Sequence, residues 1–240
     1  MISKWTREAS RFVLEDRWIR VRADRCTGGG GQVIDPYYVI CASDWVSILP
    51  MTNDGKVLVI EEYHHGGGVV APGLPGGGIE AGEDPATAAE RELLEETGYR
   101  PSQLLAVGSA YANWGNQDNL IHYFVALGCE RTGEQSLDAN DEIEVRHERV
   151  EDILQPGFFK QSFHLANILL GLPHLQRSAG WQPAPGGESI TARGMRGGDK
   201  PSGKAEPLPP GNIRRRDGPV RLTLDGLIVA LSFHPARGAG

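Results

Sequence analysis

Three carboxylates in one short stretch are the residues of this chain best suited to chemistry. Glu92, Glu95 and Glu96 stand at positions i, i+3 and i+4 of a segment whose pattern predicts a helix, so their side chains share one helix face. Carboxylates about 4 Å apart repel by ~4 kcal/mol at an effective dielectric constant near 20, so such a cluster either has raised pKa values or binds cations. Hard oxygen ligands suit Mg²⁺ or Mn²⁺. The alternative is an acidic helix face that meets only water.

Local signals predict where this helix begins and ends. Asp84 is a suitable N-cap, Pro85 suits the first helical position, and Gly98 supplies the positive φ that ends a helix, so the helix spans Pro85–Thr97. A glycine-rich turn, residues 76–78, precedes it. The helix also has an apolar stripe for packing against a core, formed by Ala86, Ala89 and Leu93. One helix face is therefore expected to bind a cation, and another to pack against the core.

The whole stretch resembles the signature of the Nudix hydrolases. That signature reads G-x5-E-x7-R-E-U-x-E-E-x-G-U, where U is aliphatic, and its fixed positions are filled here by Gly77, Glu83, Arg91, Glu92, Leu93, Glu95, Glu96, Gly98 and Tyr99. Only Tyr99 departs, because the last position is usually aliphatic. The glycines lack the spacing of a dinucleotide-binding fold, and no Gly-Lys-Ser/Thr follows as in a P-loop. Those two nucleotide-binding folds are set aside.

Flanking segments resemble the ADP-ribose pyrophosphatase branch of this family over roughly residues 10–176. The segment VLVIEEYHHGGG is similar to a strand that usually ends in an aromatic residue and an arginine, which His64 replaces here. The segment YANWGNQDNLIHYFVALG is similar to a Pro-Gly loop before a strand with an Ile-His pair, and Trp114 replaces the proline. The segment DANDEIEV resembles an acidic loop that supplies a metal ligand or the catalytic base.

The resemblance implies a role for each matching position. Its metal ligands would be Gly77, through its carbonyl, and Glu92, Glu95 and Glu96. Its catalytic residues would be Asp141, Glu142 or Glu95 as the base, and Arg91, which stands four residues before Glu95 and is expected to orient it. Glu83 would hold the metal-binding glutamates in position without binding the metal itself. A solvated loop is the alternative for Asp141 and Glu142.

Three further residues are candidates for substrate contact. His64 could face the substrate or simply form a hydrogen bond within its turn. Trp18 and Trp114 could stack on a base or pack against the sheet.

The remaining pattern predicts an α/β protein with the Nudix fold, an α/β/α sandwich with a mixed sheet and an N-terminal antiparallel strand extension. Alternation over residues 11–24 predicts one half-buried strand, and a second near Tyr37–Cys41 would complete a hairpin. Further strands are expected at Asp44–Pro50, Lys56–Tyr63, Leu104–Tyr111 and Leu120–Gly128, with one ending over Glu142–Val145 and a helix over His164–Leu170. The predicted parts are residues 1–42 as the extension, 43–177 as the core, and 178–240 as a Gly/Pro-rich disordered tail.

Composition narrows the class of protein. The chain has 240 residues, 40% of them hydrophobic, and a net charge of −7, which is typical of an ordinary soluble protein and not of a nucleic-acid-binding surface. The N-terminal residues show neither a signal peptide nor a membrane span, so a cytoplasmic location is expected. Three widely spaced cysteines, Cys26, Cys41 and Cys129, indicate neither a disulfide framework nor a zinc site.

If the resemblance holds, the expected reaction is Mg²⁺-dependent hydrolysis of a nucleoside diphosphate linked to another moiety, with ADP-ribose giving AMP and ribose 5-phosphate. Mn²⁺ is the alternative metal. Another sugar nucleotide or a dinucleotide is the alternative substrate. A third hypothesis is a sensor that binds ADP-ribose without cleaving it, against which the complete set of motif glutamates argues. By family analogy the protein is expected to be a homodimer, with no nucleic-acid or membrane partner.

Overall fold

The structure, a computed structural model, describes residues 2–137, 142–179, 220–224 and 227–231. The chain divides into two compact units, Met1–Gln182 and Pro183–Gly240, which are described separately. In the second unit, β11 (Val220–Leu224) and β12 (Leu227–Leu231) pair as an antiparallel hairpin. The rest of the predicted tail, beyond residue 179, lies outside the described residues.

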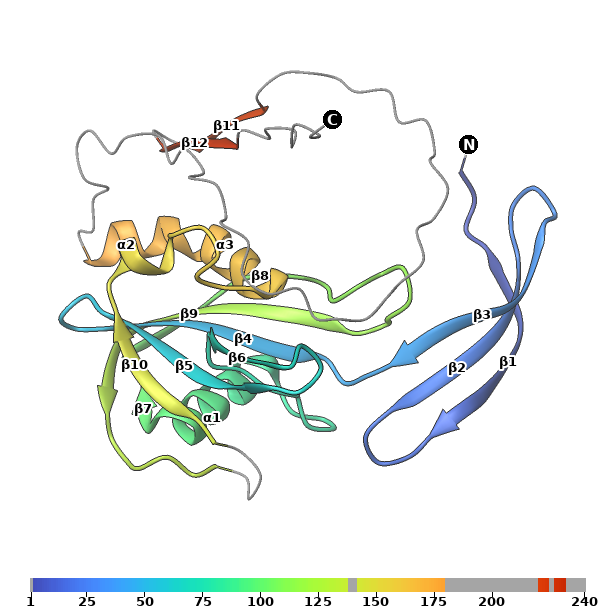
Figure 1. The fold of residues 1–240 in the computed structure, drawn as a ribbon. Coiled ribbons are helices and arrows are strands. Elements are labelled where there is room, and N and C mark those ends of the chain that lie inside the picture. The colour runs from blue at the N-terminus through green and yellow to red at the C-terminus, as the bar shows by residue number, and fades with distance from the viewer. Residues whose placement is uncertain (1, 138–141, 180–219, 225–226, 232–240) are drawn as a thin grey trace, which may run out of the picture. The chain divides into compact units, whose positions relative to one another are not determined.

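A mixed sheet forms the centre of the first unit (Figure 1). Its strands are β4 (Trp45–Thr52), β5 (Val57–His64), β6 (Val69–Gly73), β7 (Tyr99–Arg100), β8 (Gln103–Tyr111), β9 (Leu120–Arg131) and β10 (Glu144–Glu148). The strand order is β10-β5-β4-β9-β7, with β6 beside β5 and β8 beside β9. Only the central pair, β4 and β9, is parallel. A central parallel pair must be covered on both faces, which is why seven of the eight residues of β4 are buried.

Helices cover the two faces of this sheet. On one face lies α1 (Pro85–Thr97), and on the other lies α3 (Ser162–Ala179), with the short α2 (Val150–Ile153) before it (Figure 1). The core between α1 and the sheet is apolar and tightly closed, and it contains Val46, Ile48, Leu58, Ala88, Ala89, Leu93, Phe124, Ala126 and Cys129. The predicted α/β/α sandwich with a mixed sheet is confirmed.

The N-terminal extension is a separate three-stranded antiparallel sheet of β1 (Thr6–Glu15), β2 (Arg20–Thr27) and β3 (Val33–Cys41). The predicted single strand over residues 11–24 was wrong, because Asp16 starts a turn within it. The Asp16 carboxylate accepts hydrogen bonds from the N–H groups of Trp18 and Ile19, at 2.7 and 2.9 Å. An aspartate that bonds to the backbone two residues later favours a turn, which divides the alternating pattern into two strands.

This extension holds the loop of residues 112–119, which leads into β9. The Ile40 N–H donates to the Asn116 carbonyl at 2.8 Å, and Arg22 lies 3.4 Å from the Asp118 carboxylate. The Tyr37 hydroxyl donates to a carbonyl of the same loop. The N-terminal sheet therefore positions the residues that enter the central sheet at Leu120.

The remaining predicted elements were confirmed with altered ends. The strand expected to end at Val145 instead starts at Glu144, and the last helix is longer than predicted, while β6 and α2 were not predicted.

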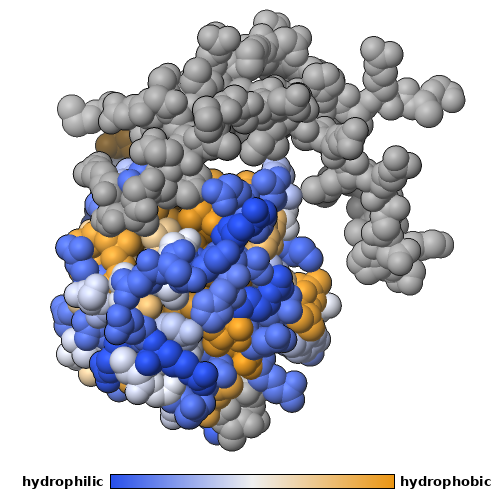
Figure 2. Space-filling view, turned by 90° about the vertical axis from the view of Figure 1, so that its left-hand side faces the viewer, coloured by the Kyte–Doolittle hydropathy of each residue, from blue (hydrophilic) through white to orange (hydrophobic). Residues whose placement is uncertain are grey.

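The edge strand β10 carries Arg146, whose guanidinium lies 2.9 Å from Glu61 and 2.6 Å from Glu148. The side of the molecule on which β10 lies is largely hydrophilic, with apolar residues in separate patches (Figure 2). Charges on an edge strand disfavour pairing with another chain. Within the described residues, no helix is long and apolar enough to span a bilayer.

Candidate active site

The glycine-rich turn leads into α1, as the sequence predicted, and the structure places it against β4. The Asp84 side chain accepts from the Ala86 N–H at 3.0 Å and caps the helix. Gly98 ends the helix with φ of 77°, and its N–H bonds to Leu94. The predicted helix limits are confirmed, and the carboxylates of α1 are therefore held at the side of the turn.

Two glycines of the turn are required by close contacts. A Cβ at Gly76 would overlap the Val46 carbonyl oxygen, and a Cβ at Gly77 would overlap the Glu92 carboxylate. The Gly77 carbonyl also accepts from the Val46 N–H at 2.9 Å, while the Gly76 N–H donates to the Glu96 carboxylate at 2.8 Å. The turn therefore fixes the backbone beside both glutamates.

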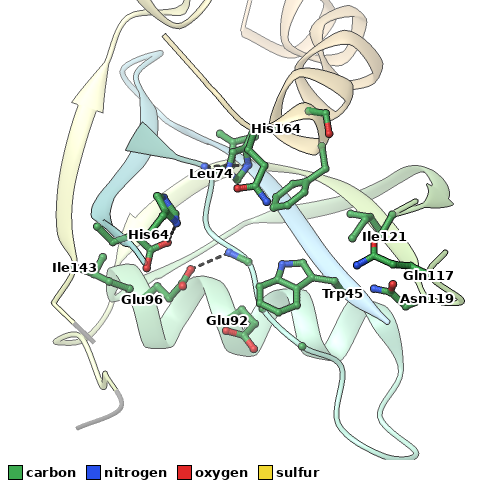
Figure 3. A pocket seen from close by; sticks show the side chains of 18 residues that line it. Trp45, His64, Leu74, Glu92, Glu96, Gln117, Asn119, Ile121, Ile143 and His164 are labelled. Carbon is green, nitrogen blue, oxygen red and sulfur yellow. Dashed lines mark hydrogen bonds and ion pairs between the residues drawn. The ribbon is translucent and has the colours of Figure 1, made fainter. Parts of the chain in front are cut away.

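The turn, α1 and several other segments line a cavity of about 640 Å³ (Figure 3). Its lining comes from the start of β4, the end of β5, the glycine turn with the preceding Leu74, α1, the loop before β9 and the start of β9, Ile143 just before β10, and the start of α3. The lining residues are Trp45, Glu62, His64, Leu74, Gly76, Gly77, Gly78, Glu92, Glu96, Ala112, Gln117, Asn119, Ile121, Ile143, Gln161, Ser162, Phe163 and His164. A cavity of this size accepts a small organic molecule. No lysine or arginine is among the lining residues that the structure describes.

Arg91 organises the side chains of α1 around it. Its guanidinium forms two hydrogen bonds of 2.9 Å to Glu83, one of 2.8 Å to Glu92 and one of 3.1 Å to Glu95. A fifth bond, of 3.1 Å, reaches the Gly78 carbonyl. A guanidinium has five N–H groups, so every one of them has an acceptor and none is left for a substrate. Arg91 thus contacts both Glu95, which it was expected to orient, and Glu83, and the roles of Arg91 and Glu83 stay predictions.

The pKa values reflect these contacts. The hydrogen bonds that Arg91 donates lower the pKa of Glu83 to about 2. The same bonds, that to Glu83 first, raise the pKa of Arg91. Burial raises the pKa of Glu92 despite its contact with Arg91. Glu92 is thus a carboxylate whose negative charge is incompletely compensated by its surroundings.

The donor set fits a hard divalent cation. Glu92 and Glu96 both line the cavity, and the Gly77 carbonyl keeps a second lone pair beside its bond to Val46. The raised pKa of Glu92 is what a cation would reverse. Among the described residues no group of three or more His, Cys, Asp or Glu side chains is gathered into a cation site. A complete ligand set therefore needs backbone oxygens, water or substrate besides these two carboxylates.

The other predicted catalytic and metal-binding residues are placed differently. Glu95 faces Arg91 and does not line the cavity, and its side chain is 41% exposed. Glu142 is exposed and lines a neighbouring hollow beside Glu62, whereas the next residue, Ile143, lines the main cavity. Asp141 lies outside the described residues.

The predicted substrate contacts divide into one inside the cavity and two outside it. His64 lines the cavity, with its Nδ1 3.8 Å from the Glu62 carboxylate. Trp18 lies in the β1–β2 turn, 77% exposed, with Arg17 over its ring at 4.3 Å. Trp114 is 86% exposed and borders a different hollow. Neither tryptophan packs in the core.

Several cavity residues escaped the sequence analysis. Trp45 supplies an aromatic surface between the α1 carboxylates and the loop before β9 (Figure 3). Asn119 and His164 are both buried and both line the cavity. The polar run of residues 116–119, three amides and Asp118 immediately before a strand, is a signal that could have pointed to Asn119. His164 had no signal, because it lies within an apolar helix pattern.

Comparison with family models agrees with this arrangement. Residues 44–165 match the NUDIX domain, and residues 5–40 match the nucleoside diphosphate sugar hydrolase N-terminal domain. The second match covers the separate sheet of β1 to β3. The two matches together include every strand and helix around the cavity up to the first turn of α3.

Curated relatives and a solved structure show the same likeness. The chain is 32% identical over 111 residues to an ADP-ribose pyrophosphatase of Bacillus subtilis (strain 168), covering 46% of this chain and 60% of that protein. It is 26% identical over 130 residues to a CMP-5'-(N-acetyl-N-hydroxy-3-aminopropyl)phosphonate hydrolase of Streptomyces rubellomurinus (strain ATCC 31215), covering 54% and 63%. The chain thus matches less than two thirds of the length of these relatives. The crystal structure of an ADP compounds hydrolase is similar in fold, with a TM-score of 0.67 at 20% identity over 75% of this chain and 98% of that one.

Proposed function

Because this chain belongs to the Nudix family, we propose that it hydrolyses the pyrophosphate bond of a nucleoside diphosphate linked to another moiety, with ADP-ribose as its substrate. Water would be added across one P–O–P linkage, giving AMP and ribose 5-phosphate. One observation carries this proposal. The motif carboxylates Glu92 and Glu96 open into a cavity of about 640 Å³ whose far side is uncharged, so the cavity has room for both a diphosphate and a neutral group. The likeness to an ADP-ribose pyrophosphatase supports this substrate.

A divalent cation would be held by Glu92, Glu96 and the Gly77 carbonyl, with Glu95 as a further ligand by family resemblance. We propose Mg²⁺, with Mn²⁺ as the alternative, because all these donors are hard oxygens. When bound, the cation supplies positive charge at the diphosphate and acidifies water. No lysine or arginine among the described lining residues could supply that charge instead.

The protein's own groups have separate tasks in the reaction. The Gly76 N–H fixes the orientation of Glu96, and Arg91 fixes Glu92 through a bond of 2.8 Å. Glu83 keeps the guanidinium in place by its two bonds. The group that removes a proton from the attacking water would come from the acidic segment before β10, where Glu142 and Asp141 stay the predicted candidates.

We further propose that the protein is a homodimer joined through the N-terminal sheet. All ten residues of β1 are exposed, including Phe12 at 41%, and Trp18 is exposed at 77% in the turn that follows. An exposed strand with apolar side chains favours pairing with another chain. In a dimer Trp18 would reach a cavity on the partner, which would give it the substrate contact that it lacks here. Light scattering should then give about twice the chain mass of 26.0 kDa.

The reaction is tested by turnover with product identification. Purified protein is incubated with Mg²⁺ and, separately, ADP-ribose, a second sugar nucleotide and a dinucleotide, with and without a chelator. We expect AMP and ribose 5-phosphate from ADP-ribose, at the highest kcat/KM of the panel, and no turnover with chelator. Tight ADP-ribose binding without any hydrolysis would instead indicate a sensor. Higher kcat/KM for another substrate would reject ADP-ribose and keep the reaction class.

A further inference from the structure

Trp45 presents an accessible aromatic surface to the cavity. Val46 and Ile48 are buried in the core beside α1, and side chains alternate along a strand, so Trp45 points to the opposite face of the sheet. Ser47 points to that face as well and is covered by α3, where Asn167 donates to its hydroxyl at 3.0 Å. Trp45 precedes this covered part of β4. It lines the cavity and is 39% exposed.

The backbone of Trp45 is fixed on both sides. It forms a β-bridge to Gly78 of the glycine-rich turn on one side and is aligned with Ile121 of β9 on the other. The preceding residue, Asp44, accepts a hydrogen bond from the Leu120 N–H at 2.8 Å. A side chain on a fixed backbone loses less conformational freedom when a ligand binds. Trp45 is therefore a preformed surface.

No protein group stacks on the indole of Trp45 in the part of the chain that the structure describes. The ring contacts and the two guanidinium–ring contacts found there involve other aromatic side chains. Trp18, for comparison, has Arg17 over its ring. A large aromatic surface left uncovered inside a cavity is typical of a ligand contact. The indole of Trp45 is thus free to stack on a bound ring.

The surroundings of the indole favour a nucleobase over a sugar. Its two backbone neighbours, Gly78 and Ile121, carry no polar side chain. Sugar hydroxyls placed between them would lose bonds to water without gaining bonds to these two side chains, whereas the π-face of a base needs none. Gln117 offers an amide for the polar edge of a base: it lines the cavity, is half-buried, and has no side-chain hydrogen bond among the described residues.

The indole also lies close to the acidic wall of the cavity. Trp45 pairs with Gly78, and a Cβ at the preceding Gly77 would overlap the Glu92 carboxylate. Figure 3 shows the indole between Glu92 and the loop that carries Gln117. In a nucleotide the base and the phosphate are attached to the same ribose. A base stacked on Trp45 would therefore leave its phosphates beside Glu92.

We propose that Trp45 is the stacking surface for the nucleobase of the substrate, with the Gln117 amide at the edge of the base. This subsite rests on the proposed hydrolysis of a nucleoside diphosphate and assigns its base to one part of the cavity. Stacking accepts any base, because each has a π-face, and the amide at the edge adds the preference among bases.

The test measures the binding of two probes to the full-length protein with Mg²⁺. One is AMP, and the other is ribose 5-phosphate, which lacks the base. Calorimetry gives both dissociation constants. Trp45→Ala should weaken the binding of AMP by about tenfold, as expected for the loss of one base–aromatic stack, and leave that of ribose 5-phosphate unchanged. Trp45→Phe keeps an aromatic face and should retain more affinity for AMP than Trp45→Leu.

Trp114→Ala is the matched control. Trp114 is 86% exposed and borders a different hollow, so the same substitution there should leave the binding of AMP as in wild type. Thermal midpoints show which variants are folded. Equal weakening of AMP binding in Trp45→Ala and Trp114→Ala would overturn the proposal, as would a Trp45→Ala variant that loses affinity equally for both probes.

A fluorescence measurement on the wild-type protein does not depend on the folding of any variant. A base stacked on an indole quenches its emission, so AMP should lower the tryptophan fluorescence and ribose 5-phosphate should not. Saturating AMP without quenching would reject the stack. Quenching that persists undiminished in folded Trp45→Phe would assign the base to another tryptophan and overturn the proposal.

Binding and turnover separate the subsite from the reaction. Hydrolysis of ADP-ribose together with unchanged AMP binding in folded Trp45→Ala would overturn the subsite and leave the proposed reaction intact. Binding of AMP that depends on Trp45, in a wild-type protein that hydrolyses no substrate, would support the subsite and contradict the reaction.

Discussion

The cavity has two walls of opposite character. The wall made by α1 and the glycine turn carries Glu92 and Glu96, held by an arginine and a backbone N–H. The wall made by the loop before β9 and the start of α3 carries uncharged groups, among them Asn119 and His164. The first wall comes from one continuous stretch of sequence and the second from two distant ones. Under the proposed function, we expect the reaction and the choice of substrate to depend on separate sets of residues.

Removing one carboxylate from the charged wall should give the largest effect. Glu96→Gln keeps the size of the side chain and its bond to Gly76 but removes a ligand charge, so we expect kcat to fall by two or more orders of magnitude. Glu90→Gln, on the exposed face of the same helix, should have little effect. Steady-state turnover at saturating Mg²⁺ measures both. Near-normal turnover of Glu96→Gln would reject its role as a ligand.

A smaller but clear loss is expected from one methyl group in the glycine turn. In Gly77→Ala the new Cβ would overlap the Glu92 carboxylate, which must then move away from its position beside the cavity. We expect kcat/KM to fall about tenfold or more, since small displacements of reacting groups have such costs. Gly78→Ala is the control, because a Cβ there meets nothing within 4 Å and φ is not positive. Equal losses in both variants would show that the effect is not specific to Glu92.

His164, on the uncharged wall, should make the free energy of unfolding depend on pH. Because folding lowers the pKa of His164 from 6.5 to about 3, the unfolded state binds more protons between these values. The free energy of unfolding therefore decreases as the pH falls from 6.5 toward 3, by at most about 1.4 kcal/mol per pH unit for this group. Thermal midpoints of His164→Gln should fall less steeply than those of wild type over this range.

Deleting residues 183–240 should change neither wall. Every described residue that lines the cavity belongs to the first unit, which ends at Gln182. We expect the kcat/KM of residues 1–182 to equal that of the full chain within about twofold, because no contact with substrate is lost. A tenfold loss of activity, or a midpoint several degrees lower, would show that the second unit contributes to the folded enzyme.

The charged wall was predictable from the sequence because its geometry is local. The spacing of Glu92, Glu95 and Glu96 and the cap residues Asp84 and Gly98 define one helix, and helix geometry does not depend on distant contacts. The same local reasoning predicted the contact between Arg91 and Glu95, but it could not show that Glu95 stays outside the cavity. That orientation depends on how the guanidinium is shared among several acceptors.

The uncharged wall was not predictable because its residues meet only through the tertiary structure. Asn119 enters the cavity because the N-terminal sheet fixes its loop through Ile40 and Arg22. His164 enters because α3 packs on β4, where Asn167 bonds to Ser47 at 2.8 Å. Trp45, as the first residue of β4, read only as part of a strand. No spacing rule connects these positions in one sequence.

The parallel pairing of β4 with β9 has a consequence for biosynthesis. Trp45 is aligned with Ile121 in that pair, so the strands at the centre of the sheet come from distant parts of the chain. While the ribosome has delivered only the segment up to α1, β4 lacks its inner neighbour and its apolar residues have one uncovered edge. Pairing between distant strands is slow compared with the closing of a hairpin. The centre of the sheet can therefore be completed only after β9 has emerged, and until then the edge of β4 that pairs with β9 has no partner.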